Sequence, residues 1–113
     1  MASFSNPVLI VDVASKQITD ANDAAVALTG YAKDELLRKT LDDIYTPETV
    51  AAILEYCVRR HILDAMPGLL LKVGDGSLLT KTGTPEHVEL YCQVFQVPTL
   101  TVRVENRPLH KRL

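Results

Sequence analysis

The N-terminal half of the chain alternates short apolar runs with polar turns. The run Val8–Val13 is rich in β-branched residues and predicts a strand, and Gln17–Ala21 follows closely enough to pair with it as a hairpin. A helix is expected next over Asp23–Thr29. Asn22 is a favourable N-cap, and Gly30 tolerates the left-handed backbone that commonly ends a helix.

The middle of the chain has a helical pattern of apolar positions. Tyr31–Leu37 predicts a single helical turn, and Lys39–Tyr45 is expected to be a connector anchored inward by Leu41 and Ile44. The longest helix is predicted from Pro47 to about Ala65. It opens on a Thr-Pro-Glu string, which suits a cap and a first turn, and a Pro-Gly pair follows it.

The second half of the chain changes to the two-residue period of strands. A turn is predicted at Gly74–Gly76, a strand over Ser77–Thr82, and a second turn at Gly83–Pro85. The clearest strand is Glu86–Val97, and the last one is Thr99–Glu105. Two strands, a helical middle and three more strands predict an α+β fold, with a five-stranded antiparallel sheet and helices packed on one face.

The strand predicted over residues 86–97 has two different faces. One face is apolar and consists of Val88, Leu90, Cys92 and Val94. Tyr91 and Phe95 lie on the opposite face, which the helices would leave uncovered. Aromatic residues on such a face usually contact a partner, so these two residues are a candidate dimer or partner surface.

Composition narrows the class of protein. The chain has 113 residues, which is the size of one domain. Its 47% hydrophobic content and net charge of −2 are those of a folded chain rather than a disordered one. No apolar run approaches the roughly 18 residues of a membrane-spanning helix, and the acidic pI of 5.9 argues against nucleic-acid binding. The first residues lack a secretory signal, so a cytoplasmic location is expected.

The order of elements and several local strings resemble a PAS domain, the sensory and dimerisation module of signalling proteins. The strings are the first strand ending in Asp, the Ile-Thr-Asp-Ala-Asn-Asp-Ala-Ala passage into the first helix, and the Leu-Thr-Gly-Tyr-Ala-Lys-Asp-Glu-Leu string. The positions that carry the resemblance are Asp12, Asn22, Gly30, Tyr31 and Leu36. The charged turn that opens the family's third strand matches either Gly74–Gly76 or Gly83–Pro85, and the second is preferred.

The resemblance implies boundaries and a function. Residues 1–7 would be an N-terminal extension, 8–105 the sensor domain, and 106–113 the start of a connector to a downstream effector. The chain would be part of a larger bacterial signalling or regulatory protein. It would form a homodimer, bind a small ligand or a partner, and relay the change to the effector. No enzymatic activity and no membrane contact are expected.

The long predicted helix presents an apolar stripe toward the sheet. With the facing strand, this stripe predicts the lining of a ligand pocket, made of Ile53, Leu54, Cys57, His61, Leu90 and Cys92. In haem-binding members of the resembled family, a His on this helix ligates iron. A haem-binding gas or redox sensor using His61 is therefore an alternative to a core His bonded to backbone, while no cofactor or metal is the default expectation.

Two further classes are disfavoured. A flavin photoreceptor would need an Asn-Cys-Arg string on a central helix, whereas Cys57 lies in Tyr-Cys-Val-Arg on another helix and fits a free core thiol. A small cone-shaped α+β enzyme using His61 as a base is a second alternative, although such folds usually begin with helices. His61, His87 and His110 are far apart, and no nucleophile elbow is present.

Overall fold

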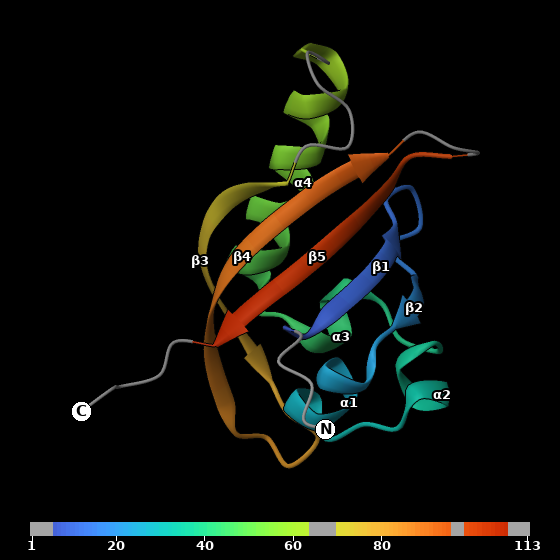
Figure 1. The fold of residues 1–113 in the computed structure, drawn as a ribbon, viewed down its shortest axis with the longest axis vertical. Coiled ribbons are helices and arrows are strands. Elements are labelled where there is room, and N and C mark those ends of the chain that lie inside the picture. The colour runs from blue at the N-terminus through green and yellow to red at the C-terminus, as the bar shows by residue number, and fades with distance from the viewer. Residues whose placement is uncertain (1–5, 64–69, 96–98, 109–113) are drawn as a thin grey trace.

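A five-stranded antiparallel sheet, covered by helices on one face, forms the domain (Figure 1). The structure is a computed structural model that describes residues 6–63, 70–95 and 99–108, without the side chains of 60–63. Its elements are β1 (Val8–Asp12), β2 (Ile18–Ala21), α1 (Asp23–Thr29), α2 (Lys33–Leu36), α3 (Leu41–Ile44), α4 (Pro47–Leu63), β3 (Leu71–Leu79), β4 (Pro85–Phe95) and β5 (Thr101–Pro108). The predicted α+β class and sheet are confirmed.

The strand order β2-β1-β5-β4-β3 places the first and last strands side by side. Leu9 of β1 lies opposite Ala21 of β2 on one side and Val104 of β5 on the other. The first hairpin is therefore paired with the last strand through β1.

The first helix begins and ends at the predicted residues. The Asn22 side chain accepts a hydrogen bond from the Ala25 amide at 2.9 Å, which satisfies one of the free donors of the first turn. Gly30 ends the helix with a φ of 80°, and its N–H donates to the Val26 carbonyl.

A third short helix replaces the predicted connector before α4. In α3, the Asp43 carboxylate accepts from the Thr40 amide at 2.9 Å and from the Thr40 hydroxyl at 3.3 Å, so a local capping interaction stabilises one helical turn. The inward anchors predicted there, Leu41 and Ile44, are both buried. The backbone here forms a helical turn and not the predicted connector, whereas the predicted inward packing of Leu41 and Ile44 is confirmed.

The turn predicted at Gly74–Gly76 is wrong, because β3 runs through it. A register shift between Lys72 and Gly74 bends the strand while its pairing with β4 continues to Leu79, so the strand predicted over 77–82 begins earlier and ends earlier. The turn between β3 and β4 contains Gly83, with a φ of 88°. This turn lies at the preferred Gly83–Pro85 alternative, but it precedes β4, which begins at Pro85, so neither alternative opens the third strand.

The last strand continues past its predicted end. β5 starts at Thr101 rather than Thr99 and reaches Pro108, which lies opposite Val88 of β4. The first three residues of the expected connector, 106–108, therefore belong to the sheet.

The core lies between α4 and the inner face of the sheet. The predicted apolar face of β4 is confirmed, since all four of its residues are buried. From α4, Val50, Ile53 and Cys57 are buried against it, while Glu55 and Arg59 are exposed. Among the described residues, no helix is long and apolar enough to cross a bilayer.

Candidate functional site

The apolar interior brings together four of the six predicted pocket residues. Ile53 and Cys57 from α4, with Leu90 and Cys92 from β4, have no exposed surface and belong to one core cluster. Leu54 is partly buried against the same cluster. His61 has its backbone in α4, but its side chain lies outside the described residues. The haem and enzyme alternatives that depend on it stay predictions.

Both cysteines are free thiols inside the core. Burial raises the pKa of Cys57 to about 12. Burial also raises the pKa of Cys92, and the nearby Cys57 raises it further. Both thiols are therefore protonated at neutral pH, which favours a packing role over a nucleophilic one.

Three hollows on the surface are lined by other residues. One of about 150 Å³ lies between α4 and β3, beside Ala52 and Val73. One of about 480 Å³ lies where the start of α4 meets β3, beside Glu48 and His87, and one of about 320 Å³ follows the end of α1. None of the three is lined by a predicted pocket residue. Within residues 6–59, 70–95 and 99–108, no group of three or more His, Cys, Asp or Glu side chains could hold a metal ion.

The face of the sheet opposite the helices, called here the outer face, carries the two predicted aromatic residues. Phe95 is 37% exposed, and Tyr91 is partly exposed beneath the Arg107 guanidinium, which lies 3.7 Å from the ring centroid. The predicted outward orientation of both is confirmed. Val58 and Leu79, the other large apolar residues that are well exposed in the described part of the chain, belong to α4 and β3.

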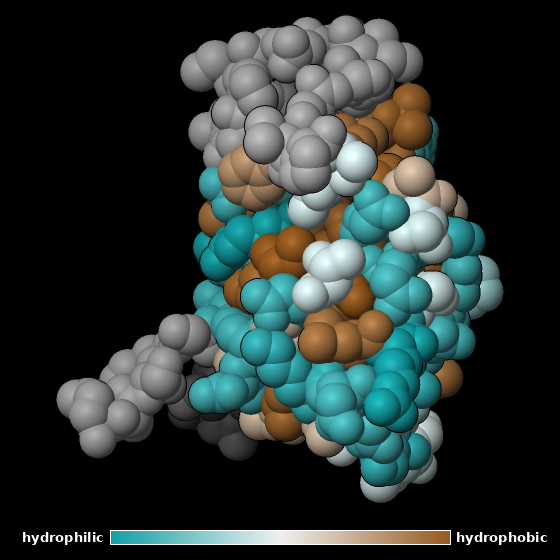
Figure 2. Space-filling view, turned by 90° about the vertical axis from the view of Figure 1, so that its right-hand side faces the viewer, coloured by the Kyte–Doolittle hydropathy of each residue, from teal (hydrophilic) through white to brown (hydrophobic). Residues whose placement is uncertain are grey.

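The flank formed by β1 and β2 has a mixed surface. In the described part of this flank, hydrophilic residues separate the hydrophobic ones into small patches (Figure 2). This flank therefore presents no single large hydrophobic patch in its described part.

An ion cluster that sequence analysis did not predict surrounds Glu105 on the outer face. Its carboxylate accepts hydrogen bonds from Arg107 Nε at 2.8 Å, Arg103 Nη1 at 3.1 Å and Asn6 Nδ2 at 3.0 Å. Burial raises the pKa of Glu105, but these donors outweigh burial and the pKa lies below its usual value. A charged carboxylate can therefore remain nearly buried beside the start of the chain.

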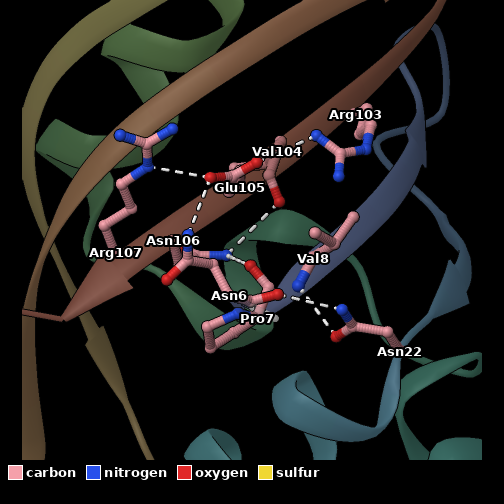
Figure 3. A network of polar contacts seen from close by, with 9 residues as sticks. All are labelled: Asn6, Pro7, Val8, Asn22, Arg103, Val104, Glu105, Asn106 and Arg107. Carbon is pink, nitrogen blue, oxygen red and sulfur yellow. Dashed lines mark hydrogen bonds and ion pairs between the residues drawn. The ribbon is translucent and has the colours of Figure 1, made fainter. Parts of the chain in front are cut away.

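On the inner face, Asn106 contacts Tyr45, Pro7 and Val104, and Figure 3 shows its contacts with Pro7 and Val104. Its side-chain oxygen accepts from the buried Tyr45 hydroxyl, and its side-chain nitrogen donates to the Pro7 carbonyl at 3.2 Å. The backbone N–H of Asn106 donates to the same Pro7 carbonyl at 2.7 Å. The signal for this residue in the sequence is the two-residue period of β5, which places position 106 on the inner face after Val102 and Val104.

Asn22 also binds the residues that lead into β1. Asn22 Nδ2 donates to the Asn6 carbonyl at 2.9 Å, and Asn22 Oδ1 accepts from the Val8 amide at 2.9 Å (Figure 3). Asn22 thus caps α1 and holds the backbone that leads into β1. The last two residues of the predicted N-terminal extension, Asn6 and Pro7, are anchored by these contacts.

The other residues of the family resemblance have structural roles. Asp12 accepts from the Ser15 hydroxyl at 2.6 Å and from the Ser15 amide, and these bonds lower its pKa and hold the β1–β2 turn. The Tyr31 ring lies 4.6 Å from Lys39 Nζ, and Leu36 is fully buried. None of the three contacts a described hollow.

Comparisons with known proteins agree with this architecture. The family model described as the PAS fold matches residues 1–95. A PAS domain from a two-component sensor histidine kinase is 16% identical with a TM-score of 0.74, and the alignment covers 92% of this chain and 85% of that one. No curated protein matches the chain.

Two further solved structures are similar in fold. The PAS domain of nitrogen regulation protein NR(II) from Vibrio parahaemolyticus is 18% identical with a TM-score of 0.70, covering 95% of this chain and 92% of that one. The PAS-B domain of Drosophila melanogaster Cycle, with bound ethylene glycol, is 12% identical with a TM-score of 0.70, covering 91% and 99%.

Proposed function

This chain belongs to the PAS family, and from that premise we propose that it is a signal-sensing module that pairs with a second copy through its outer face. PAS domains are sensory modules of signalling proteins. The observation that carries the pairing is the position of Phe95 and Tyr91, two aromatic side chains on the face that the helices do not cover. Burying them against a partner would remove apolar surface from water.

Replacing both aromatic residues tests the pairing. In the double variant Tyr91→Glu/Phe95→Glu, each copy would bring two negative charges to a symmetric interface, so four would repel one another there. We expect wild-type chain to sediment as a dimer and the variant as a monomer, with an unchanged far-ultraviolet circular dichroism spectrum.

Val58→Glu is the matched control, because Val58 is 51% exposed but lies on α4. This control should remain dimeric. A double variant that still sediments as a dimer would reject the outer face as the interface, and a monomer for Val58→Glu alone would move the interface to α4.

The sensed molecule is proposed to bind among the interior residues, which are Ile53, Leu54, Cys57, His61, Leu90 and Cys92. Apart from His61 these side chains are apolar, which favours a small apolar ligand. Haem held by His61 is the second candidate, and it rests on the position of His61 along α4. A Soret absorbance band that disappears in His61→Ala would support haem, whereas a colourless protein as purified would leave the apolar ligand.

The output is proposed to leave through the residues that follow β5. The segment beginning at residue 109 would connect the domain to an effector within a larger bacterial signalling or regulatory protein. The proposed role is binding and relay rather than catalysis, and the proposed location is the cytoplasm. A ligand can produce such a relay only by binding two conformations with different affinities.

A further inference from the structure

We propose that Asn106 is a positioning residue that couples the apolar interior to the adjacent start of β1 and end of β5, and that the Tyr45 hydroxyl controls its orientation. In the latched state, Tyr45 donates to Asn106, and Asn106 holds the start of β1 against the end of β5. In the released state, the Tyr45 bond is broken and both strand ends loosen together. That this movement is an output signal rests on the proposed function, whereas the coupling itself does not.

The inner end of this connection is fixed to the helical layer. Tyr45 is 4% exposed and follows α3, where its amide donates to the Leu41 carbonyl at 2.9 Å. Its backbone also forms an isolated bridge with Leu78 of β3. A shift of α3, of the start of α4 or of β3 therefore moves the Tyr45 hydroxyl relative to Asn106.

The other end of this connection is the bond between Asn106 and Pro7, just before β1. The Pro7 carbonyl accepts from both the backbone and the side-chain nitrogen of Asn106. Pro7 immediately precedes β1, and Asn106 lies two residues before the end of β5. The Pro7 carbonyl therefore links the start of β1 and the end of β5 to the orientation of the Asn106 side chain.

The amide cannot compensate for loss of the Tyr45 bond by rotating. Its nitrogen faces the carbonyls of Pro7 at 3.2 Å and Val104 at 3.4 Å, so a half-turn would place its oxygen against two acceptors. The original orientation would leave the oxygen without a donor in a residue that is 1% exposed. Both outcomes are unfavourable, so the Tyr45 bond stabilises the one orientation of Asn106 in which its nitrogen binds Pro7.

The candidate pocket residues are direct neighbours of this connection. Leu90 lies opposite Asn106 in the β4–β5 register, and Cys92 lies opposite Val104. Residues opposite each other share a face of the sheet, so a ligand that displaces these side chains displaces the surroundings of Asn106.

Amide hydrogen exchange measured by NMR tests the coupling in the chain without any ligand. Tyr45→Phe removes only the hydroxyl. We expect the amides of residues 105–107 to exchange about tenfold faster relative to the mean of the β3 and β4 amides. The matched control is Thr29→Val, which removes another buried hydroxyl, one that donates to the Ala25 carbonyl at 2.8 Å in α1. It should not change that ratio.

A double-mutant comparison separates coupling from general destabilisation. In an Asn106→Leu background, Tyr45→Phe should leave the exchange ratio of residues 105–107 unchanged, because the intermediary is already absent. The same acceleration with and without Asn106, or a uniform acceleration in Tyr45→Phe alone, would overturn the proposal.

A wild-type measurement covers the case in which Asn106→Leu does not fold. The side-chain NH₂ protons of Asn106 should be protected from exchange, and rapid exchange at the solvent rate would also overturn the proposal. A monomeric wild-type protein would refute the proposed pairing and leave this result intact, so the two failures are distinguishable.

Discussion

Ile53→Ala is expected to lower the free energy of unfolding by about 3 kcal/mol. Ile53 lies on the inward face of α4 with none of its surface exposed, inside the cluster that contains Leu90 and Cys92. Truncation removes three side-chain carbons from an apolar environment and leaves a cavity that the helix and sheet can only partly close. Urea denaturation followed by circular dichroism measures the change.

Val58→Ala is the control for this substitution, because it shortens a side chain on the same helix that is 51% exposed. It should change the unfolding free energy by less than about 0.5 kcal/mol. Equal costs for the two variants would mean that α4 does not pack against the sheet as described.

Gly76→Ala is expected to cost about 2 kcal/mol through crowding between α4 and β3. An added Cβ would lie 2.7 Å from both Leu90 Cδ1 and Thr49 Cγ2. Thr49 cannot easily rotate away, because its hydroxyl accepts from the Ser77 amide at 3.0 Å and lies 2.8 Å from the Thr46 hydroxyl. Chemical denaturation measures the cost.

Thr49→Ser provides the matched background for the glycine substitution. It removes the clashing methyl group and retains the hydroxyl that holds β3. In this background the cost of Gly76→Ala should fall by about half, a non-additivity expected of residues in contact. An unchanged cost would show that the close approach of α4 to β3 is not what requires glycine at this position.

Local signals in the sequence were sufficient for most of the fold. The alternation along Val88, Leu90, Cys92 and Val94 identifies the buried face of β4, because the pleat places every second side chain on the same side. The cap at Asn22 and the termination at Gly30 depend only on residues within one turn of α1. Such features are predictable because the groups that determine them are adjacent in the chain.

Features that depend on distant partners were not predicted. Gly74–Gly76 has the composition of a turn, yet pairing with β4 keeps it in a strand, and the register shift absorbs its irregular backbone. Asn106 belongs to a polar stretch that suggests a connector. Its buried position depends on Tyr45, 61 residues earlier, and on Pro7 at the other end of the chain. The two-residue period of β5 indicates the inner face for position 106, but no local pattern identifies Tyr45 and Pro7 as its partners.

Native mass spectrometry of the purified chain tests most directly whether this domain is a sensing and pairing module. It reports the number of copies and any retained small molecule in one spectrum. We expect a wild-type dimer that becomes a monomer in Tyr91→Glu/Phe95→Glu, with the extra mass of any bound ligand visible in the same spectrum. A monomeric wild-type protein would contradict the proposed pairing, and a chain at its bare mass would contradict the retention of a ligand.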